Sequence, residues 1–243
     1  MTDIQIKKML SFLKYTPLHP QWHSFRDEKT LMKSVGFSTH GTLLDIGCAN
    51  QRLKYFLSEN CNYIALDYYK TATDLYGAIP NIYGDAQKLP FIDESADTVA
   101  LIEVLEHLPD PNAAIAEAYR VLKVGGHLVI TVPFLYPIHD APYDFHRWTQ
   151  FGLEELALRY NFRIKEQRYR GRPTETAALL ANIAAAKMTL DMLSRRNPIG
   201  LAAALLLCVL IPLTNIIGWL FAFLCRNDEF MPFGYFIKLC KNQ

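Results

Sequence analysis

The feature that most constrains the fold is a regular alternation of short apolar runs and helix-like stretches that begins at Gly41. An apolar run bounded by turn residues is typical of a buried strand, and apolar residues at helical spacing are typical of a helix packed on a sheet. The predicted strands are 42–47, 62–67, 81–84, 97–103, 127–132, 162–169 and 233–241. The predicted helices between them are 50–59, 110–123 and 149–160, and Gly125-Gly126 is expected to end the second. The alternation predicts an α/β fold with a doubly wound, mostly parallel, seven-stranded sheet whose final strand is antiparallel.

The chain before Gly41 and the chain after residue 170 differ in character from this core. Helical patterns over residues 4–14 and 25–35 precede it, and the amphipathic start does not have the pattern of a secretory signal peptide. We predict four parts: an N-terminal helical cap (1–40), a core (41–170), a hydrophobic helical insertion (171–230) and a final core strand (231–243).

The insertion contains no charged residue from Asn197 to Cys225. A straight helix of that length would cross the ~30 Å hydrocarbon core of a bilayer at ~1.5 Å per residue. Pro212, Thr214 and Asn215 fall in its middle, where proline breaks a helix and polar groups are costly against lipid. The pattern therefore predicts two half-helices, each too short to span.

Topology and flanking charge also argue against a single crossing. One crossing would leave the strands predicted at 162–169 and 233–241 on opposite sides of the bilayer, unable to pair. Arg195, Arg196 and Arg226 place positive charge at both ends of the apolar segment, which favours the cytoplasmic side. We expect a cytoplasmic protein associated with the cytoplasmic membrane leaflet through a re-entrant or in-plane hairpin of residues 197–225, beside a helix over 174–193. Two true spans, and a hydrophobic helix pair buried in a homodimer, are the alternatives.

Net charge limits the kinds of partner, and cysteine content indicates the redox compartment. The chain has 25 Lys and Arg against 24 Asp and Glu, a net charge of +1, so it does not have the basic excess of a protein that binds nucleic acid through phosphates. Its five cysteines are scattered and odd in number, which indicates neither a disulfide framework nor a structural zinc site, and favours a reducing compartment.

The first predicted strand ends in Asp45-Ile-Gly47 and continues through Cys48-Ala49-Asn50-Gln51 into a helix. Such a turn brings backbone N–H groups and a helix N-terminus up to a ligand. Asp67 lies about 20 residues further on, at the end of the next strand, where a carboxylate can accept hydrogen bonds from both hydroxyls of a ribose. Only one glycine of a dinucleotide-type pattern is present, so hydride transfer is the poorer match. An ordinary turn glycine and a capping aspartate are the structural alternatives.

Five ordered blocks extend this signal: LLDIGCA, YIALDYY, GDAQKLPF, DESADTVALIEVLEHLPDP and EAYRVLKVGGHLVITVPF. Over residues 41–170 the chain resembles the class I S-adenosylmethionine-dependent methyltransferases, near their small-molecule branch. The resemblance implies a Rossmann-like methyltransferase fold and S-adenosylmethionine as cofactor.

The resemblance also assigns roles to seven residues. Asp45 and Gly47 would lie beside the methionyl part of the cofactor, Asp67 would bind the ribose, and Tyr68 would lie against the adenine face. Glu103 would lie next to the sulfonium, at the end of the fourth strand. The full set implied for the cofactor is Asp45, Gly47, Asp67, Tyr68, Asp85, Ala86 and Glu103, with Asp85 and Ala86 at the adenine edge.

The loop after the fifth strand is dense in polar and aromatic side chains, and topology places it over the ligand-binding edge of the sheet. His139 and His146 are the predicted catalytic bases, since an imidazole suits proton transfer near neutrality, and Asp144, or Asp140 in its place, would orient one of them. His107 is a further candidate base. No metal site is predicted, because the histidines show neither HxxxH nor HxH spacing.

Together these observations predict methyl transfer from S-adenosylmethionine to oxygen on an amphiphilic or lipid-linked small-molecule acceptor. The acceptor class rests on the insertion alone, because a lipid-associated helix pair would let an apolar substrate enter the site. The competing hypothesis is a catalytically inactive, methyltransferase-like binding module attached to a membrane or a partner. Ala49 and Gln51, in place of glycines, favour that alternative.

Overall fold

The computed structural model describes residues 11–195 and 198–242. The chain forms two compact units, and each is described by itself. The first comprises Thr30–Arg168 together with the chain from Gly234 onward, and the second comprises the segment up to Lys29 together with Tyr169–Phe233.

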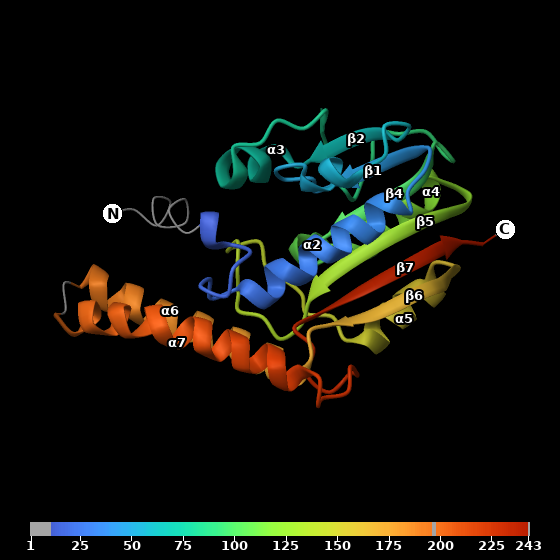
Figure 1. Ribbon diagram of the computed structural model, residues 1–243. Helices are drawn as coiled ribbons and strands as arrows, with labels where there is room; N and C mark the ends of the chain where they lie inside the picture. The colour runs from blue at the N-terminus through green and yellow to red at the C-terminus, as the bar shows by residue number, and fades with distance from the viewer. Residues whose placement is uncertain (1–10, 196–197, 243) are drawn as a thin grey trace. The chain divides into compact units, whose positions relative to one another are not determined.

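The first unit is built on a seven-stranded sheet in the order β3-β2-β1-β4-β5-β7-β6 (Figure 1). Strands β3, β2, β1, β4 and β5 run parallel to their neighbours, and β7 is antiparallel to β5. The bounds are β1 Thr42–Ile46, β2 Asn62–Asp67, β3 Ile82–Tyr83, β4 Ala96–Ile102, β5 Leu122–Pro133, β6 Phe162–Arg170 and β7 Gly234–Lys241. The predicted mixed sheet with an antiparallel last strand is confirmed.

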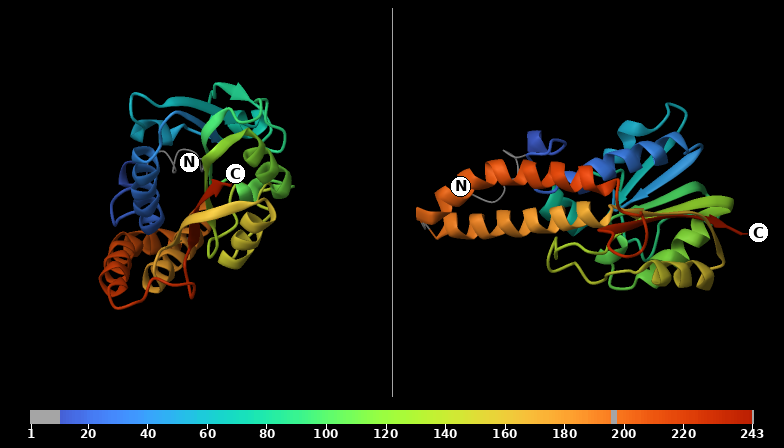
Figure 2. Two further views of the ribbon diagram at one scale, coloured as in Figure 1. Left: turned by 90° about the vertical axis from the view of Figure 1, so that its right-hand side faces the viewer. Right: turned by 60° about the horizontal axis from the view of Figure 1, so that its bottom comes forward.

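Helices cover both faces of this sheet, which is why the central strands are apolar on both sides. In the end-on view of Figure 2, the part of α2 (Trp22–Phe37) that belongs to this unit, from Thr30 onward, lies on one face, and α4 (Pro111–Val121) and α5 (Gln150–Arg159) lie on the other. Leu31 and Val35 of α2 pack with Leu43 of β1 in the main buried cluster. The shorter helical segments are η1 Ser11–Leu13, η2 Arg52–Phe56, α3 Tyr69–Thr71, η3 Ala72–Tyr76 and η4 Leu105–His107.

Two helix predictions differ from the structure, and a third is mostly untested. The helix expected over 110–123 ends at Val121, and Gly125 and Gly126 lie inside β5, so the prediction that they end the helix is wrong. The helix expected over 50–59 is only the 3-10 turn η2, because Gln51 before it is left-handed and Leu57 after it is extended. The helix expected over 4–14 falls mostly outside the described residues.

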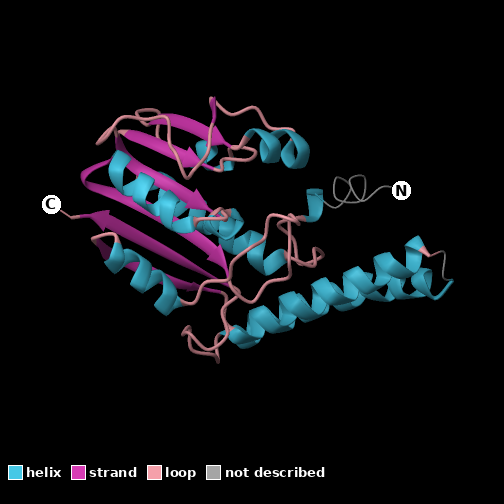
Figure 3. Ribbon diagram, turned by 180° about the vertical axis from the view of Figure 1, so that it is seen from behind, coloured by secondary structure: helices cyan, strands magenta, loops and turns pink. Residues whose placement is uncertain are grey.

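The second unit contains a helical hairpin of α6 (Pro173–Ser194) and α7 (Pro198–Ala222), which run side by side in Figures 1 and 3. Pro212 lies inside α7, so the prediction of two half-helices too short to span is wrong. Pro173–Ser194 and Ile199–Ala222 are each long and apolar enough to cross a bilayer, a property that core helices of soluble proteins share. The hairpin also returns the chain to β7, which neighbours β6 as the topological argument required.

The polar residues in the middle of α7 are satisfied within this unit. The Asn182 amide donates to Asn215 Oδ1 at 2.9 Å, and the Thr214 hydroxyl donates to Asn182 Oδ1 at 2.6 Å. The Asn215 amide donates in turn to the carbonyls of Pro17 and His19, at 2.7 and 3.0 Å. These hydrogen bonds remove the cost of placing polar groups in an apolar helix, which explains why the helix continues through this point.

Candidate functional site

The turn after β1 keeps a glycine-like backbone although only one glycine is present. Gly47, Ala49 and Gln51 have φ angles of 69°, 42° and 52°, in the left-handed region. Gly47 has a steric requirement as well, since a Cβ there would lie 2.4 Å from Val104 Cγ2. The N–H groups of Gly47 and Cys48 donate to the Leu66 carbonyl of β2, at 2.8 and 3.2 Å. The sequence departs from the glycine pattern at Ala49 and Gln51, but the backbone does not.

Asp67, at the end of β2, is buried and fixes this turn. Its Oδ2 accepts a hydrogen bond from the Ala49 N–H at 2.7 Å. Its Oδ1 accepts from the Tyr68 N–H at 2.8 Å and from the Thr71 hydroxyl at 3.1 Å. Burial raises the pKa of the Asp67 carboxyl, and these hydrogen bonds oppose the rise. The Cys48 thiol is a weak fourth donor, 4.0 Å from Oδ2, so a ligand hydroxyl that binds Asp67 has to replace or share this contact.

Asp45 of β1 is a second buried carboxyl beside Asp67. Burial raises the pKa of Asp45 to about 7; the Tyr63 hydroxyl, which donates to Oδ2 at 2.6 Å, opposes the rise, and the charge of Asp67 adds to it. A carboxyl that ionises near neutrality is suited to pair with a ligand cation, because the cation offsets the desolvation of the charge.

The other residues implied for the cofactor follow the carboxyl ends of neighbouring strands. Tyr68 directly follows β2 and is 53% exposed. Asp85, in the turn after β3, accepts from the Gln87 N–H at 2.8 Å, and Ala86 beside it is buried. Glu103 follows β4 with a left-handed φ of 55°, and its N–H donates to the Thr131 hydroxyl at 3.0 Å. Topology brings all of them to one edge of the sheet, while their individual roles stay predictions.

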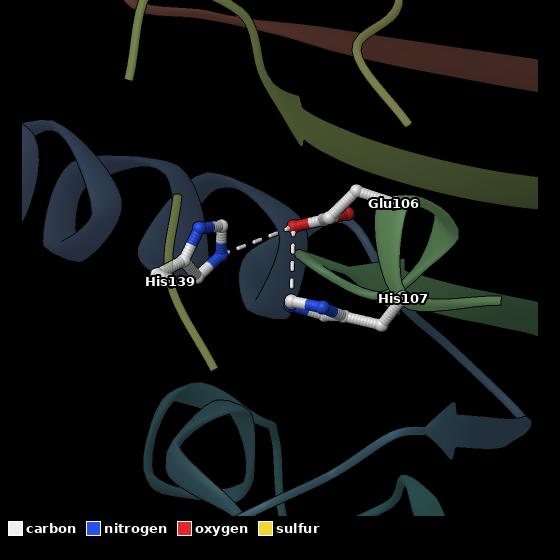
Figure 4. Close-up of side chains that lie close together, drawn as sticks. All are labelled: Glu106, His107 and His139. Carbon is white, nitrogen blue, oxygen red and sulfur yellow. Dashed lines mark ion pairs between the residues drawn. The ribbon is translucent and has the colours of Figure 1, made fainter. Parts of the chain in front are cut away.

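Glu106 of η4 is the functional candidate that the sequence analysis missed. Its side chain is fully buried, and neither carboxylate oxygen has a hydrogen-bond partner among the described residues. His107 Nε2 and His139 Nε2 lie 3.6 and 3.8 Å from Glu106 Oε1 (Figure 4). Burial raises the pKa of Glu106, and the two imidazoles oppose the rise. The linear sequence gave little signal of this cluster, because His139 comes from the β5–α5 loop, which follows an intervening helix and strand.

His139 also lies beside Asp144, as predicted. Asp144 Oδ2 is 3.2 Å from His139 Nδ1 and accepts a hydrogen bond from the His139 N–H at 3.0 Å. Burial alone would lower the pKa of His139, but Glu106, Asp144 and Asp140 raise it. Burial would likewise raise the pKa of Asp144, but Arg147, which donates to Oδ2 at 2.7 Å, and His139 lower it to about 2. Asp144 therefore stays ionised and orients the His139 ring.

His146 lies apart from this cluster in its contacts. Its Nε2 is 3.1 Å from the Leu108 carbonyl, and its backbone N–H donates to the Glu106 carbonyl at 3.2 Å. Asp140 accepts instead from the Tyr76 hydroxyl at 2.6 Å, so it does not orient a histidine. The contacts of His146 connect the β5–α5 loop to η4, and its predicted catalytic role is untested.

A model of the methyltransferase domain family matches residues 44–130. Residues 44–130 form a class I methyltransferase domain. S-adenosylmethionine is the cofactor of this family. The paired buried carboxyls and the left-handed turn fit a ligand that presents a cation to Asp45 and a sugar hydroxyl to Asp67.

Individual relatives match only parts of the chain. The ubiquinone/menaquinone biosynthesis C-methyltransferase UbiE of Rhizobium leguminosarum is 36% identical over 84 residues, which cover 32% of each protein. Sterol 24-C-methyltransferase erg-4 of Neurospora crassa is 30% identical over 128 residues, 47% of this chain and 34% of that protein. The chain spans about a third of the length of these curated relatives.

Solved structures match over more of the chain at lower identity. The cyclase SpnF has a TM-score of 0.55 at 18% identity, covering 98% of this chain and 94% of that one. Phosphoethanolamine N-methyltransferase 2 of Haemonchus contortus, solved with S-adenosyl-L-methionine, has a TM-score of 0.54 at 15% identity, covering 96% and 59%. These likenesses show the fold. Because one belongs to a cyclase, activity must be argued from the site.

Proposed function

We propose that this protein transfers the methyl group of S-adenosylmethionine to an oxygen of an amphiphilic, lipid-like small molecule. The observation that supports it most is the pair of buried carboxyls, Asp45 and Asp67, under a left-handed turn at the carboxyl edge of the sheet. Asp45 is suited to the cofactor's ammonium, and the acceptor position of Asp67 that the weakly donating Cys48 thiol approaches is suited to a ribose hydroxyl.

When bound, S-adenosylmethionine would supply an electrophilic methyl group. The acceptor oxygen would bond to the methyl carbon as the carbon–sulfur bond breaks, the electron pair would stay on sulfur, and the hydroxyl proton would pass to His139, the predicted base beside Asp144. The protein's main contribution to such a displacement is to position the acceptor and exclude competing water. Residues His139 and Asp144 of the β5–α5 loop, and Glu106 and His107 of η4, form the polar cluster that we assign to the acceptor side.

The lipid-like acceptor is supported by two separate observations. The names of the relatives refer to ubiquinone, menaquinone and sterols, which are largely apolar molecules. In the second unit, α7 exposes large apolar side chains, among them Leu201, Leu205 and Val209 at 63%, 66% and 63%. An exposed apolar surface of this kind favours contact with a membrane, where such acceptors dissolve. We propose that the protein associates with the cytoplasmic leaflet through this helix.

The competing class is an inactive binding module with a methyltransferase fold. The sequence favoured this class only because Ala49 and Gln51 stand where glycines were expected. Both residues have the left-handed φ angles that glycine would adopt, which weakens this argument. Both relatives are named as carbon methyltransferases and not as oxygen methyltransferases, so the methylated atom is a separate outcome of the product analysis.

Calorimetry with S-adenosylmethionine and the full chain tests the proposed cofactor site. Asp67→Asn should weaken binding by about tenfold or more, because hydrogen bonds to a charged group contribute about 1.5–3 kcal/mol. Asp74→Asn is the matched control, since Asp74 is an exposed carboxylate on the next segment of the chain, and its affinity should equal that of the wild type. Absence of binding by the wild-type protein would favour the inactive module.

Mass spectrometry of lipid extracts incubated with protein and isotope-labelled cofactor tests the transfer. We expect a product heavier by one labelled methyl group, and fragmentation assigns the methyl to oxygen or carbon. His139→Ala should lower turnover while leaving cofactor affinity unchanged, and His146→Ala should do so only if His146 takes part in the reaction. Cofactor binding without any methylated product would also favour the inactive module.

A further inference from the structure

Glu106, His107 and His139 direct one ligand atom each toward a common point at the carboxyl edge of the sheet (Figure 4). These three atoms, one carboxylate oxygen and two ring nitrogens, all lie within 4.8 Å of one another. We propose that they form a binding site for a divalent transition-metal ion of the zinc type. Two imidazoles and one carboxylate are a ligand set that such ions bind in catalytic sites.

The state of Glu106 is the first argument for a bound cation. The carboxylate is fully buried, and neither oxygen has a hydrogen-bond partner among the described residues. The two imidazole nitrogens approach Oε1 only to 3.6 and 3.8 Å, beyond hydrogen-bonding distance. Two distant ion pairs without a hydrogen bond compensate a buried carboxylate poorly, and buried charges are normally hydrogen-bonded as well as paired, or coordinate a metal. A cation between the three ligands removes this cost.

The partners of the two imidazoles are the second, independent argument. A histidine that binds a metal through one ring nitrogen usually donates its other N–H to a carboxylate or a backbone carbonyl. His139 Nδ1 lies 3.2 Å from Asp144 Oδ2, and His107 Nδ1 lies 2.9 Å from the Tyr143 carbonyl. Both Nδ1 atoms are thereby directed away from the cluster, and both Nε2 atoms remain to bind the ion.

The separations of the ligand atoms are close to those of a coordinated ion. Zinc–nitrogen and zinc–oxygen bonds of about 2.0–2.1 Å place tetrahedral ligands roughly 3.3 Å apart. The observed 3.6 and 3.8 Å from Glu106 Oε1 to the two nitrogens need to shorten slightly on binding, and the largest separation in the cluster, up to 4.8 Å, needs to shorten by about 1.5 Å. The His107 and His139 rings are already adjacent, with centroids 4.9 Å apart.

Three protein ligands leave a coordination position open, as in catalytic zinc sites. The side chains of His107 and His139 are 17% and 26% exposed, so the cluster is reached from solvent. An acceptor hydroxyl bound at the open position would lose its proton more readily, because a metal ion lowers the pKa of a coordinated oxygen. His139 would then act as a ligand and not as a base. This use of the ion rests on the proposed methyl transfer, whereas metal binding itself does not.

The test is a titration of the full chain, without a histidine tag and freed of metal by a chelator, with Co²⁺ alone as the spectroscopic probe. We expect a visible absorption band that saturates at one ion per chain and is displaced by Zn²⁺. Glu106→Gln and His139→Ala should abolish the band. Asp144→Asn, which removes the partner of a ligand, should weaken Co²⁺ binding about 10- to 100-fold.

His146→Ala is the control, because it removes a histidine of the same loop whose ring nitrogen contacts a carbonyl outside the cluster; it should keep the band. Thermal unfolding of each variant without metal shows whether it is folded, and Glu106→Gln should be at least as stable as the wild type, since it removes a buried charge. Absence of a saturable band in the wild type, or an unchanged band in the Glu106 and His139 variants, would overturn the proposal. The readout needs neither cofactor nor acceptor, so failure of methyl transfer leaves it standing.

Discussion

Asp45 shows how one residue links folding to ligand binding. Burial raises the pKa of its carboxyl to about 7, against an ordinary value of 3.8. The folded protein therefore keeps a proton on Asp45 that the unfolded chain releases. Asp45 is also the residue assigned to the cofactor's ammonium, so a cation that binds there should displace this proton.

This shift gives stability a defined pH dependence. The contribution of protonated Asp45 is complete below the unfolded pKa, decreases as pH rises from about 4, and is lost above about 7. At 1.36 kcal/mol per pKa unit the decrease is on the order of 4 kcal/mol. Asp45→Asn should remove this part of the pH dependence, as measured by urea unfolding near pH 5 and near pH 8.

Tyr63→Phe is the matching control, because it removes the hydrogen bond that lowers the pKa of Asp45. In Tyr63→Phe the pKa of Asp45 should be higher, so the free energy of unfolding should continue to decrease to a higher pH than in the wild type. Equal pH dependence in the wild type and Asp45→Asn would show that Asp45 ionises normally in the folded protein.

For single residues, contacts between positions close in the sequence were predicted better than burial or backbone conformation. His139 and Asp144 are five positions apart in one loop, so their contact followed from proximity in the chain. The left-handed backbone of Ala49 and Gln51 was not predicted, because neither residue type favours it and it is imposed by Asp67 and the β2 backbone. Glu106 was missed, since nothing in the local sequence indicates that its carboxylate is buried next to a distant loop.

Among the elements, the α6–α7 hairpin depends on the polar contacts at Asn182, Thr214 and Asn215. Asn215 is fully buried and bonds to Asn182, Pro17 and His19, so one side chain joins three segments of the second unit. A close approach of the helices occurs nearby, where a Cβ on Gly218 would lie 2.8 Å from Ala178 Cβ.

Asn215→Leu should destabilise the hairpin by about 1–3 kcal/mol, because it leaves buried partners without hydrogen bonds. Ile216→Ala, at the adjacent, 41% exposed position, should change stability by less than about 0.5 kcal/mol. Thermal unfolding followed by circular dichroism compares the two. Similar melting temperatures for both variants would show that the polar contacts do not hold the hairpin together.

The strands were the most predictable elements, because apolar runs bounded by turn residues leave few alternatives for a buried sheet. Helices that contain proline or follow a left-handed turn were less predictable. Pro212 does not interrupt α7, because the helix packs along α6 and gains the Asn182 contacts that no local pattern reveals. The 3-10 turn η2 replaces a longer helix, because the turn before it is left-handed.

For the whole molecule, the exposed apolar side chains of α7 are the basis of the proposed membrane association. Leu201, Leu205 and Val209 are each more than half exposed on α7. Transfer of such side chains from water to lipid is favourable by about 1.5–3 kcal/mol each. We expect the wild-type protein to sediment with phospholipid vesicles, and replacement of all three residues by Glu to leave it in solution.

Phe151→Glu is the control for this experiment, because it places a charge on a 65% exposed aromatic residue of the first unit. It should sediment with vesicles like the wild type. Wild-type protein that stays in solution with vesicles and sediments as a dimer in their absence would favour the alternative in which the apolar helices are buried between two copies of the chain.

The strand order also sets a sequence of events during synthesis. β7 lies between β5 and β6 but is translated after α6 and α7. Until residues 234–241 have been made, the edges of β5 and β6 that face β7 have no partner strand. The hairpin therefore precedes β7 in synthesis, and the sheet that carries the candidate site is completed only after both of its helices have been made.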